Sequence, residues 1–135
     1  MAATVQEVAD GLAEALRAVY VRAHSDVPDN ITPPTAVIML DGVPTYHGAE
    51  QGGLPTYTMR VQTVVDNLSN RSAFSTLNSF MSYDGDKSLR AAIETDRTLG
   101  GVCQTLIVER AENIGELAVG DVRYLAADII VTVYA

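Results

Sequence analysis

The chain has little of what a catalytic protein usually displays. It has one cysteine, two histidines and no tryptophan in 135 residues. A single cysteine excludes an intramolecular disulfide, and Cys103 follows Val102 at an expected strand start, where a small buried thiol is the usual finding. His24 and His47 lie on different segments without a second ligand at metal-binding spacing. We therefore expect no metal, no cofactor and no enzymatic activity, although catalytic groups brought together only by folding leave no such motif.

Long apolar runs and positive charge are also scarce. No run approaches about 18 apolar residues, and the N-terminus lacks a basic segment followed by an unbroken apolar one, so we expect neither a membrane span nor ordinary secretion. Nine Lys and Arg stand against 17 Asp and Glu, for a net charge of −8. This balance disfavours stable wrapping of nucleic acid. It suits a surface past which DNA slides without adhering, because cationic contacts bind phosphate through counterion release. The alternative is that the charge only keeps the domain soluble.

What the sequence does have is strand periodicity. The chain is 47% hydrophobic, which suits one domain over residues 1–135 with a real core. Residues 122–134 alternate so that the odd positions from Leu125 to Val133 are all apolar, and residues 57–66 repeat the pattern. Residues 104–110 predict a third long strand, which the glycine-containing segment 113–121 returns antiparallel to the last one. The expected core positions are Leu77, Phe74, Met59, Val61, Leu125, Ile129 and Val131.

Helical spacing appears in three places. Thr4 and Glu7 match a capping box before a helix over residues 5–18, in which Gly11 indicates close packing against the sheet. A second helix, capped by Ser69 or Asn70, has an apolar face made by Ala73, Phe74, Leu77, Phe80 and Met81. Asp86 is the expected cap of a third, shorter helix through residue 94.

Two shorter strands and a long connection complete the pattern. Residues 20–24 predict a short strand, and residues 35–40 predict a buried one that Asp41 and Gly42 end. Residues 43–55 are rich in glycine and proline and longer than most hairpin loops, so we expect an extended β-arm or a mobile flap. The order of elements contains no alternating βαβ series. It predicts an α+β fold, with a mostly antiparallel β-sheet flanked by an N-terminal helix and two central helices.

Taken together, these segments resemble the tail terminator, or tail completion, proteins of long-tailed bacteriophages. The resemblance covers nearly the whole chain and is carried by the order of its parts. These are the N-terminal helix, the Pro33-Pro34 entry to strand 35–40, the loop around Tyr46-His47-Gly48, strand 57–66, the segments 88–93 and 98–101, and the closing strand. The stretch from 88 to 101 is the most suggestive and contains no catalytic residue.

The resemblance implies a ring-forming subunit of the virion, made in the host cytoplasm. The ring, generally a hexamer, would cap the head-proximal end of the tail tube, end tube growth and offer the joining surface to head completion or neck proteins. DNA would pass through the lumen without specific binding. We expect the candidate assembly arm to comprise Tyr46, His47, Gly48, Glu50, Gly52 and Gly53. Candidate lumen acids are Asp26, Asp29, Glu50 and Glu112.

Two other readings remain open on the sequence. A head-tail connector or a tail tube subunit shares this size, acidity and ring assembly, but a tube subunit stacks indefinitely whereas a terminator closes into one ring. A small cytoplasmic enzyme or ligand-binding domain would instead display a pocket with perturbed carboxylates. A flat sheet with exposed edges would favour assembly.

Overall fold

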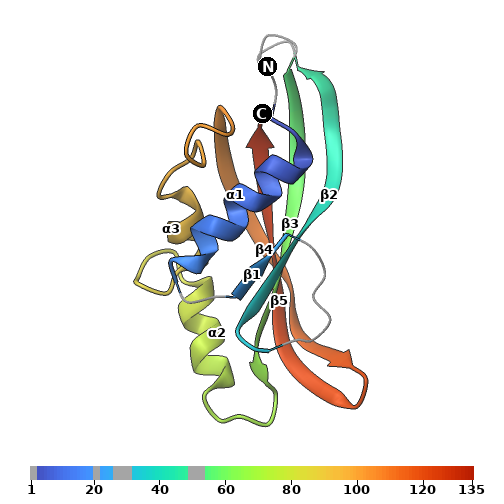
Figure 1. Ribbon diagram of the computed structural model, residues 1–135. Coiled ribbons are helices and arrows are strands. Elements are labelled where there is room, and N and C mark those ends of the chain that lie inside the picture. Colours follow the sequence, from blue (N-terminus) through green and yellow to red (C-terminus); the bar gives the residue numbers. More distant parts are fainter. Residues whose placement is uncertain (1–2, 20–21, 26–31, 49–53) are drawn as a thin grey trace.

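A computed structural model describes residues 3–19, 22–25, 32–48 and 54–135 of the chain. Within these ranges the order of elements is α1 (Val5–Arg17), β1 (Arg22–His24), β2 (Thr35–Gly48), β3 (Leu54–Asn67), α2 (Ala73–Met81), α3 (Leu89–Glu94), β4 (Thr105–Val119) and β5 (Val122–Tyr134). The strands form one sheet in the order β1-β2-β3-β5-β4, in which β1 is parallel to β2 and the other pairs are antiparallel (Figure 1). The predicted α+β class with a mostly antiparallel sheet is confirmed.

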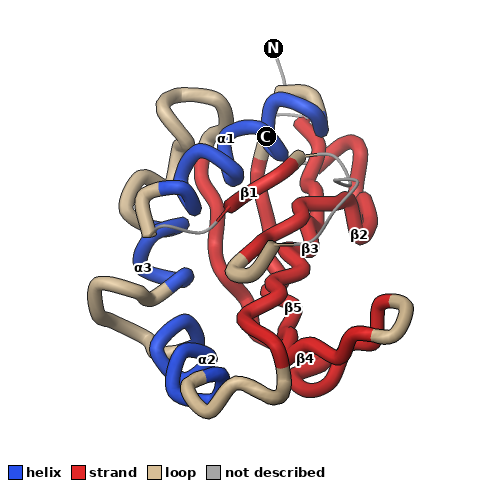
Figure 2. Tube along the Cα trace, turned by 60° about the horizontal axis from the view of Figure 1, so that its bottom comes forward, coloured by secondary structure: helices blue, strands red, loops and turns tan. Residues whose placement is uncertain are grey.

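The helices lie together on one face of the sheet, and no helix in the described part of the chain covers the other face (Figures 1 and 2). β5 runs between β3 and β4, and its odd-numbered residues from Leu125 to Val133 belong to the core, as predicted. Its even-numbered side is also buried at Asp128 and Ile130, which the alternation did not predict. A strand flanked on both sides of a twisted sheet is covered by its neighbours even where no helix lies over it.

The N-terminal helix begins as expected. The Thr4 hydroxyl accepts a hydrogen bond from the Glu7 N–H at 3.2 Å, and the Glu7 carboxylate accepts one from the Thr4 N–H at 3.0 Å, which is a capping box. Gly11 does mark a close approach, but its neighbour is Leu99 rather than the sheet. A Cβ at position 11 would lie 3.1 Å from the Leu99 Cβ, so the loop before β4 is held directly against α1.

The two central helices differ in detail from the prediction. Ser72 takes the N-cap position of α2 in place of Ser69 or Asn70, but its side chain makes no capping hydrogen bond to the helix. Phe74 was predicted to be in the core but is 59% exposed, whereas Phe80 on the same helix is 3% exposed. The buried residues of α2 are Ala73, Leu77 and Phe80, and position 74 lies one residue, or about 100° of helix rotation, away from Ala73 on that face. Ser88, not Asp86, caps α3 by accepting a hydrogen bond from the Ala91 N–H.

The strands are longer than the alternation indicated. Asp41 and Gly42 do not end β2, which continues to Gly48, so residues 43–48 are strand rather than irregular loop. β4 likewise continues to Val119, and the chain turns into β5 at Gly120 and Asp121 rather than over residues 113–121. Bulges explain both misses. Register shifts after Leu40 and around Gly115 interrupt the alternation without ending the backbone pairing.

Candidate assembly surfaces

The outer edge of β2 is largely free of a strand partner. β1 pairs with β2 only at Thr35, Ala36 and Val37, and from residue 38 to 48 no strand of the described ranges lies along this edge. Three register shifts fall between Leu40 and Gly48, and Pro44 has no N–H to donate. Bulges and edge prolines limit indiscriminate strand pairing. The edge is therefore open, but only a complementary partner would match its irregular backbone.

The predicted arm is the end of the β2–β3 hairpin. Tyr46, His47 and Gly48 belong to β2, Gly48 pairs with Leu54, and the Tyr46 side chain is 64% exposed. Glu50, Gly52 and Gly53 lie outside the described residues. Of the two sequence alternatives, an extended β-arm describes residues 43–48 and 54–55 of the connection. The mobile flap, the other alternative, is not tested, because residues 49–53 lie outside the described residues.

The second free edge is β4, which is 15 residues long and pairs only with β5. Ile107 and Ile114 on this strand are 40% and 53% exposed. Two register shifts, between Val108 and Arg110 and between Glu112 and Gly115, break its regularity as those in β2 do. Both outer edges of the sheet are thus unpaired over most of their length.

An ion-pair network, here called the Arg60 cluster, crosses the helix-free face of the sheet. Arg60 on β3 reaches Asp41 on β2 at 2.9 Å, Asp128 on β5 at 2.6 Å and Glu112 on β4 at 3.1 Å. Asn113 donates a further hydrogen bond to Asp128 at 3.0 Å. The cluster therefore links four neighbouring strands.

The charges of the Arg60 cluster stabilise one another. Hydrogen bonds to Asp41 and Asp128 raise the pKa of Arg60, so the guanidinium stays charged throughout the accessible pH range. The hydrogen bond from Arg110 and the contact with Arg60 lower the pKa of Glu112. Sequence reasoning did not identify the cluster, although its signal was visible. Arg60 and Asp128 are charged residues in the middle of β3 and β5, next to the core residues Met59 and Ile129.

The predicted lumen acids are only partly described. Glu112 belongs to the Arg60 cluster and also pairs with Arg110 at 3.1 Å. Two arginines thus compensate the charge of Glu112 within the protomer, which makes Glu112 a weaker candidate for a residue that repels DNA. Asp26, Asp29 and Glu50 lie outside the described residues, and a lumen position for any of the four stays a prediction.

A glutamate joins the helical layer to β4. The Glu94 carboxylate accepts hydrogen bonds from Arg90 at 2.6 Å and from the Val108 N–H at 3.2 Å. Burial raises the pKa of Glu94, but these hydrogen bonds and the charge of Arg97 outweigh burial, and the net shift is downward. Arg90 also stacks over Tyr83, with its guanidinium carbon 3.8 Å from the ring centre. Glu94 is thus the link between α3 and the edge strand.

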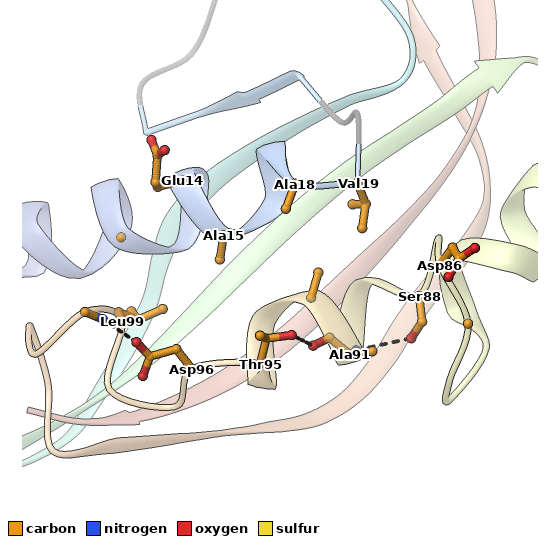
Figure 3. Close-up of a pocket in the computed structure, with 14 residues that line it drawn as sticks. Glu14, Ala15, Ala18, Val19, Asp86, Ser88, Ala91, Thr95, Asp96 and Leu99 are labelled. Atoms are coloured by element: carbon orange, nitrogen blue, oxygen red, sulfur yellow. Dashed lines mark hydrogen bonds between the residues drawn. The ribbon is translucent and has the colours of Figure 1, made fainter.

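A groove of about 500 Å³ opens between α1 and the segment that contains α3 (Figure 3). Small side chains form much of its wall, with Ala15 and Ala18 on the α1 side and Ala91 on the α3 side. Its charged lining residues are all acidic, namely Glu14, Asp86 and Asp96. The sequence gave no indication of this groove, because its walls come from segments about 70 residues apart.

Among the described residues, no helix combines the length and the hydrophobicity that spanning a membrane requires. No group of three or more His, Cys, Asp or Glu side chains in the same ranges could hold a metal ion. Cys103 is buried, and burial raises the pKa of its thiol, which disfavours the reactive thiolate. In comparisons with known proteins, no family model matches the chain and no curated protein matches its sequence.

Proposed function

We propose that this protein is a structural subunit of a bacteriophage virion. It assembles into a ring, of about six copies by the family resemblance, that caps the head-proximal end of the tail tube. The observation that carries the proposal is a sheet that, within the described residues, has two free outer edges and one face without helices. Unpaired strand edges are templates for further strands. A head-to-tail ring can use them by adding a strand of one protomer to the sheet of the next.

The irregular edges fit a subunit in which each edge pairs only with the complementary edge of a neighbouring copy. Bulges and Pro44 in β2, and bulges and charged residues in β4, oppose unlimited edge-to-edge association. A ring must stop at a fixed number of copies, whereas a regular edge favours continued growth. The β2–β3 arm, with Tyr46 exposed near its end, supplies a contact element that extends the pairing surface.

The acidity of the chain fits a conduit for DNA. A net charge of −8 per copy gives an assembled ring a strongly negative field, and cations that would bind phosphate are few. One face of the ring would meet the tail tube protein and the other the head completion or neck proteins. The DNA would pass through without sequence-specific contacts.

The test is tube assembly with and without this protein. Purified tail tube protein is allowed to polymerise alone and with the chain added, and tube lengths are measured by negative-stain electron microscopy. A terminator added at the start should shorten the tubes and appear as a cap at one end. If the chain co-polymerises along the tube, or stacks into tubes by itself, it is a tube subunit instead. If it leaves tube length unchanged and binds no end, the proposal is wrong.

A further inference from the structure

We infer that the groove between α1 and α3 receives Phe74 from a second copy of this chain. The inference rests on the proposed ring and adds the contact that would join neighbouring protomers. It combines an apolar groove on one part of the molecule with an exposed aromatic residue on another. The groove is lined by residues of α1, α3 and the loops that flank α3, and Phe74 is not among them. The contact must therefore be made between copies.

Phe74 is suited to enter such a groove. It is 59% exposed, in the first turn of α2, although a phenylalanine normally contributes to a core. Aromatic anchors that fill a pocket on the partner carry much of the binding energy of protein interfaces. An aromatic side chain presents about 150–250 Å² for burial, and a hollow of about 500 Å³ has room for one ring.

The groove also has the shape that an aromatic ring needs. Ala15, Ala18 and Ala91 end at Cβ, so their helices leave space between them instead of filling it (Figure 3). Leu99 packs on Gly11 and closes off the groove there, since a Cβ added at Gly11 would lie 3.1 Å from the Cβ of Leu99. The inserted ring would therefore meet aliphatic groups on several sides.

Charge complementarity supports a second copy as the occupant. Arg71 lies three residues before Phe74, is exposed, and makes no ion pair with a carboxylate of the described ranges. The charged groups of the groove are carboxylates only. Phe74 and Arg71 of one copy thus present an apolar group and a cation to an apolar groove with an acidic rim.

Asp86 is the rim carboxylate available to Arg71. Glu14 already pairs with Arg17 at 3.0 Å. The Asp96 carboxylate is already occupied within its own turn. It accepts hydrogen bonds from the Thr98 hydroxyl and from two N–H groups, and these bonds lower its pKa. Asp86 makes no such bond within the part of the chain that the structure describes, and its neighbour Lys87 lines a different hollow.

The symmetry of this contact agrees with a ring. The aromatic group and the groove are different surfaces of one protomer, so in a head-to-tail arrangement the contact is heterologous and each bound copy still offers one unused surface. Such contacts continue until the chain of protomers closes on itself. A protomer in which only Phe74 or only the groove is intact would stop the growth of the assembly instead.

The test uses two complementary variants. Phe74→Ser removes the inserted side chain, and Ala15→Trp fills the groove. Each variant alone should be monomeric under conditions in which the wild type forms a ring. An equimolar mixture retains one intact contact, from Phe74 of the groove-filled copy into the open groove of the other. It should give a heterodimer and no larger species by native mass spectrometry. Val122→Ser, a change at another exposed apolar residue, is the control and should still form rings.

A charge exchange tests the same contact without filling the groove. At low salt, Arg71→Asp should raise the protein concentration needed for ring formation at least tenfold. Adding Asp86→Arg to the same chain should restore most of the ring formation. Circular dichroism of every variant checks that the fold is retained. If Ala15→Trp alters the fold, the charge exchange decides.

The outcomes separate this contact from the proposed function. If the wild type forms rings and Phe74→Ser or the charge exchange has no effect, the contact is wrong and the ring stands. If Phe74→Ser prevents assembly but the groove variants do not, Phe74 binds elsewhere and the contact is again wrong. If the wild type forms open filaments or dimers that depend on both surfaces, the contact holds and the terminator function fails.

Discussion

The two phenylalanines of the chain provide an internal comparison on one helix. Phe80 is 3% exposed and packs in the core, whereas Phe74 is 59% exposed. A fully buried aromatic side chain removes about 150–250 Å² from water, which at about 25 cal/mol per Å² gives an upper bound of about 4–6 kcal/mol. We predict that Phe80→Ala lowers the free energy of unfolding by about 3–5 kcal/mol, as core Phe→Ala changes usually do.

The matching change at position 74 should cost about 1 kcal/mol or less. More than half of that side chain is already in water, and alanine favours a helix over phenylalanine by about 0.5 kcal/mol. Urea denaturation followed by circular dichroism measures both values. The protein must be dilute enough that the midpoint does not change with concentration, since assembly would add apparent stability. Equal losses for the two variants, or a larger loss for Phe74→Ala, would refute the assignment of the inner face of α2.

Three further predictions concern charge and the arm. Because the folded-state pKa of Glu94 is lowered from its ordinary value of 4.5, its stabilising contribution is present above about pH 4.5 and is lost as pH falls through the folded pKa. Glu94→Gln should therefore lower stability at pH 7 and flatten the loss seen in urea denaturation between pH 5 and pH 3. Arg60→Gln should destabilise the protomer by leaving Asp128 without its cation, and Asp128→Asn in the same chain should recover part of the loss; additive effects in this double-mutant cycle would contradict the pairing. Deletion of residues 49–53 should preserve the circular dichroism spectrum but reduce assembly, and full assembly of the deleted chain would remove the arm from the mechanism.

Much of the fold could be predicted, because the core residues recur in the sequence as apolar positions with the period of a helix or a strand. The closing strand was placed at its observed bounds, and the capping box at Thr4 located the start of α1. The misses share physical causes. Bulges after Leu40 and around Gly115 break the alternation while backbone pairing continues. Phe74 has the spacing of a core residue, but the inner face of α2 is formed by Ala73, Leu77 and Phe80, which leaves position 74 exposed.

The candidate surfaces were less accessible to sequence reasoning. The hairpin arm was visible as a composition change around residues 43–55. The Arg60 cluster needs the order β2-β3-β5-β4 before its four charged residues become neighbours. The groove needs α1 to pack beside α3 and Leu99. Such sites depend on contacts between distant segments, which a periodicity along the chain does not encode.

The central claim is that the protein closes into a ring of fixed size, and native mass spectrometry of the purified full chain tests it most directly. The spectrum should be recorded over a range of protein concentrations, with and without the tail tube protein. The account predicts one dominant closed oligomer, about six copies, whose mass stops increasing as concentration rises. A protein that stays monomeric under all these conditions, or a ladder of oligomers that grows without limit, would contradict it.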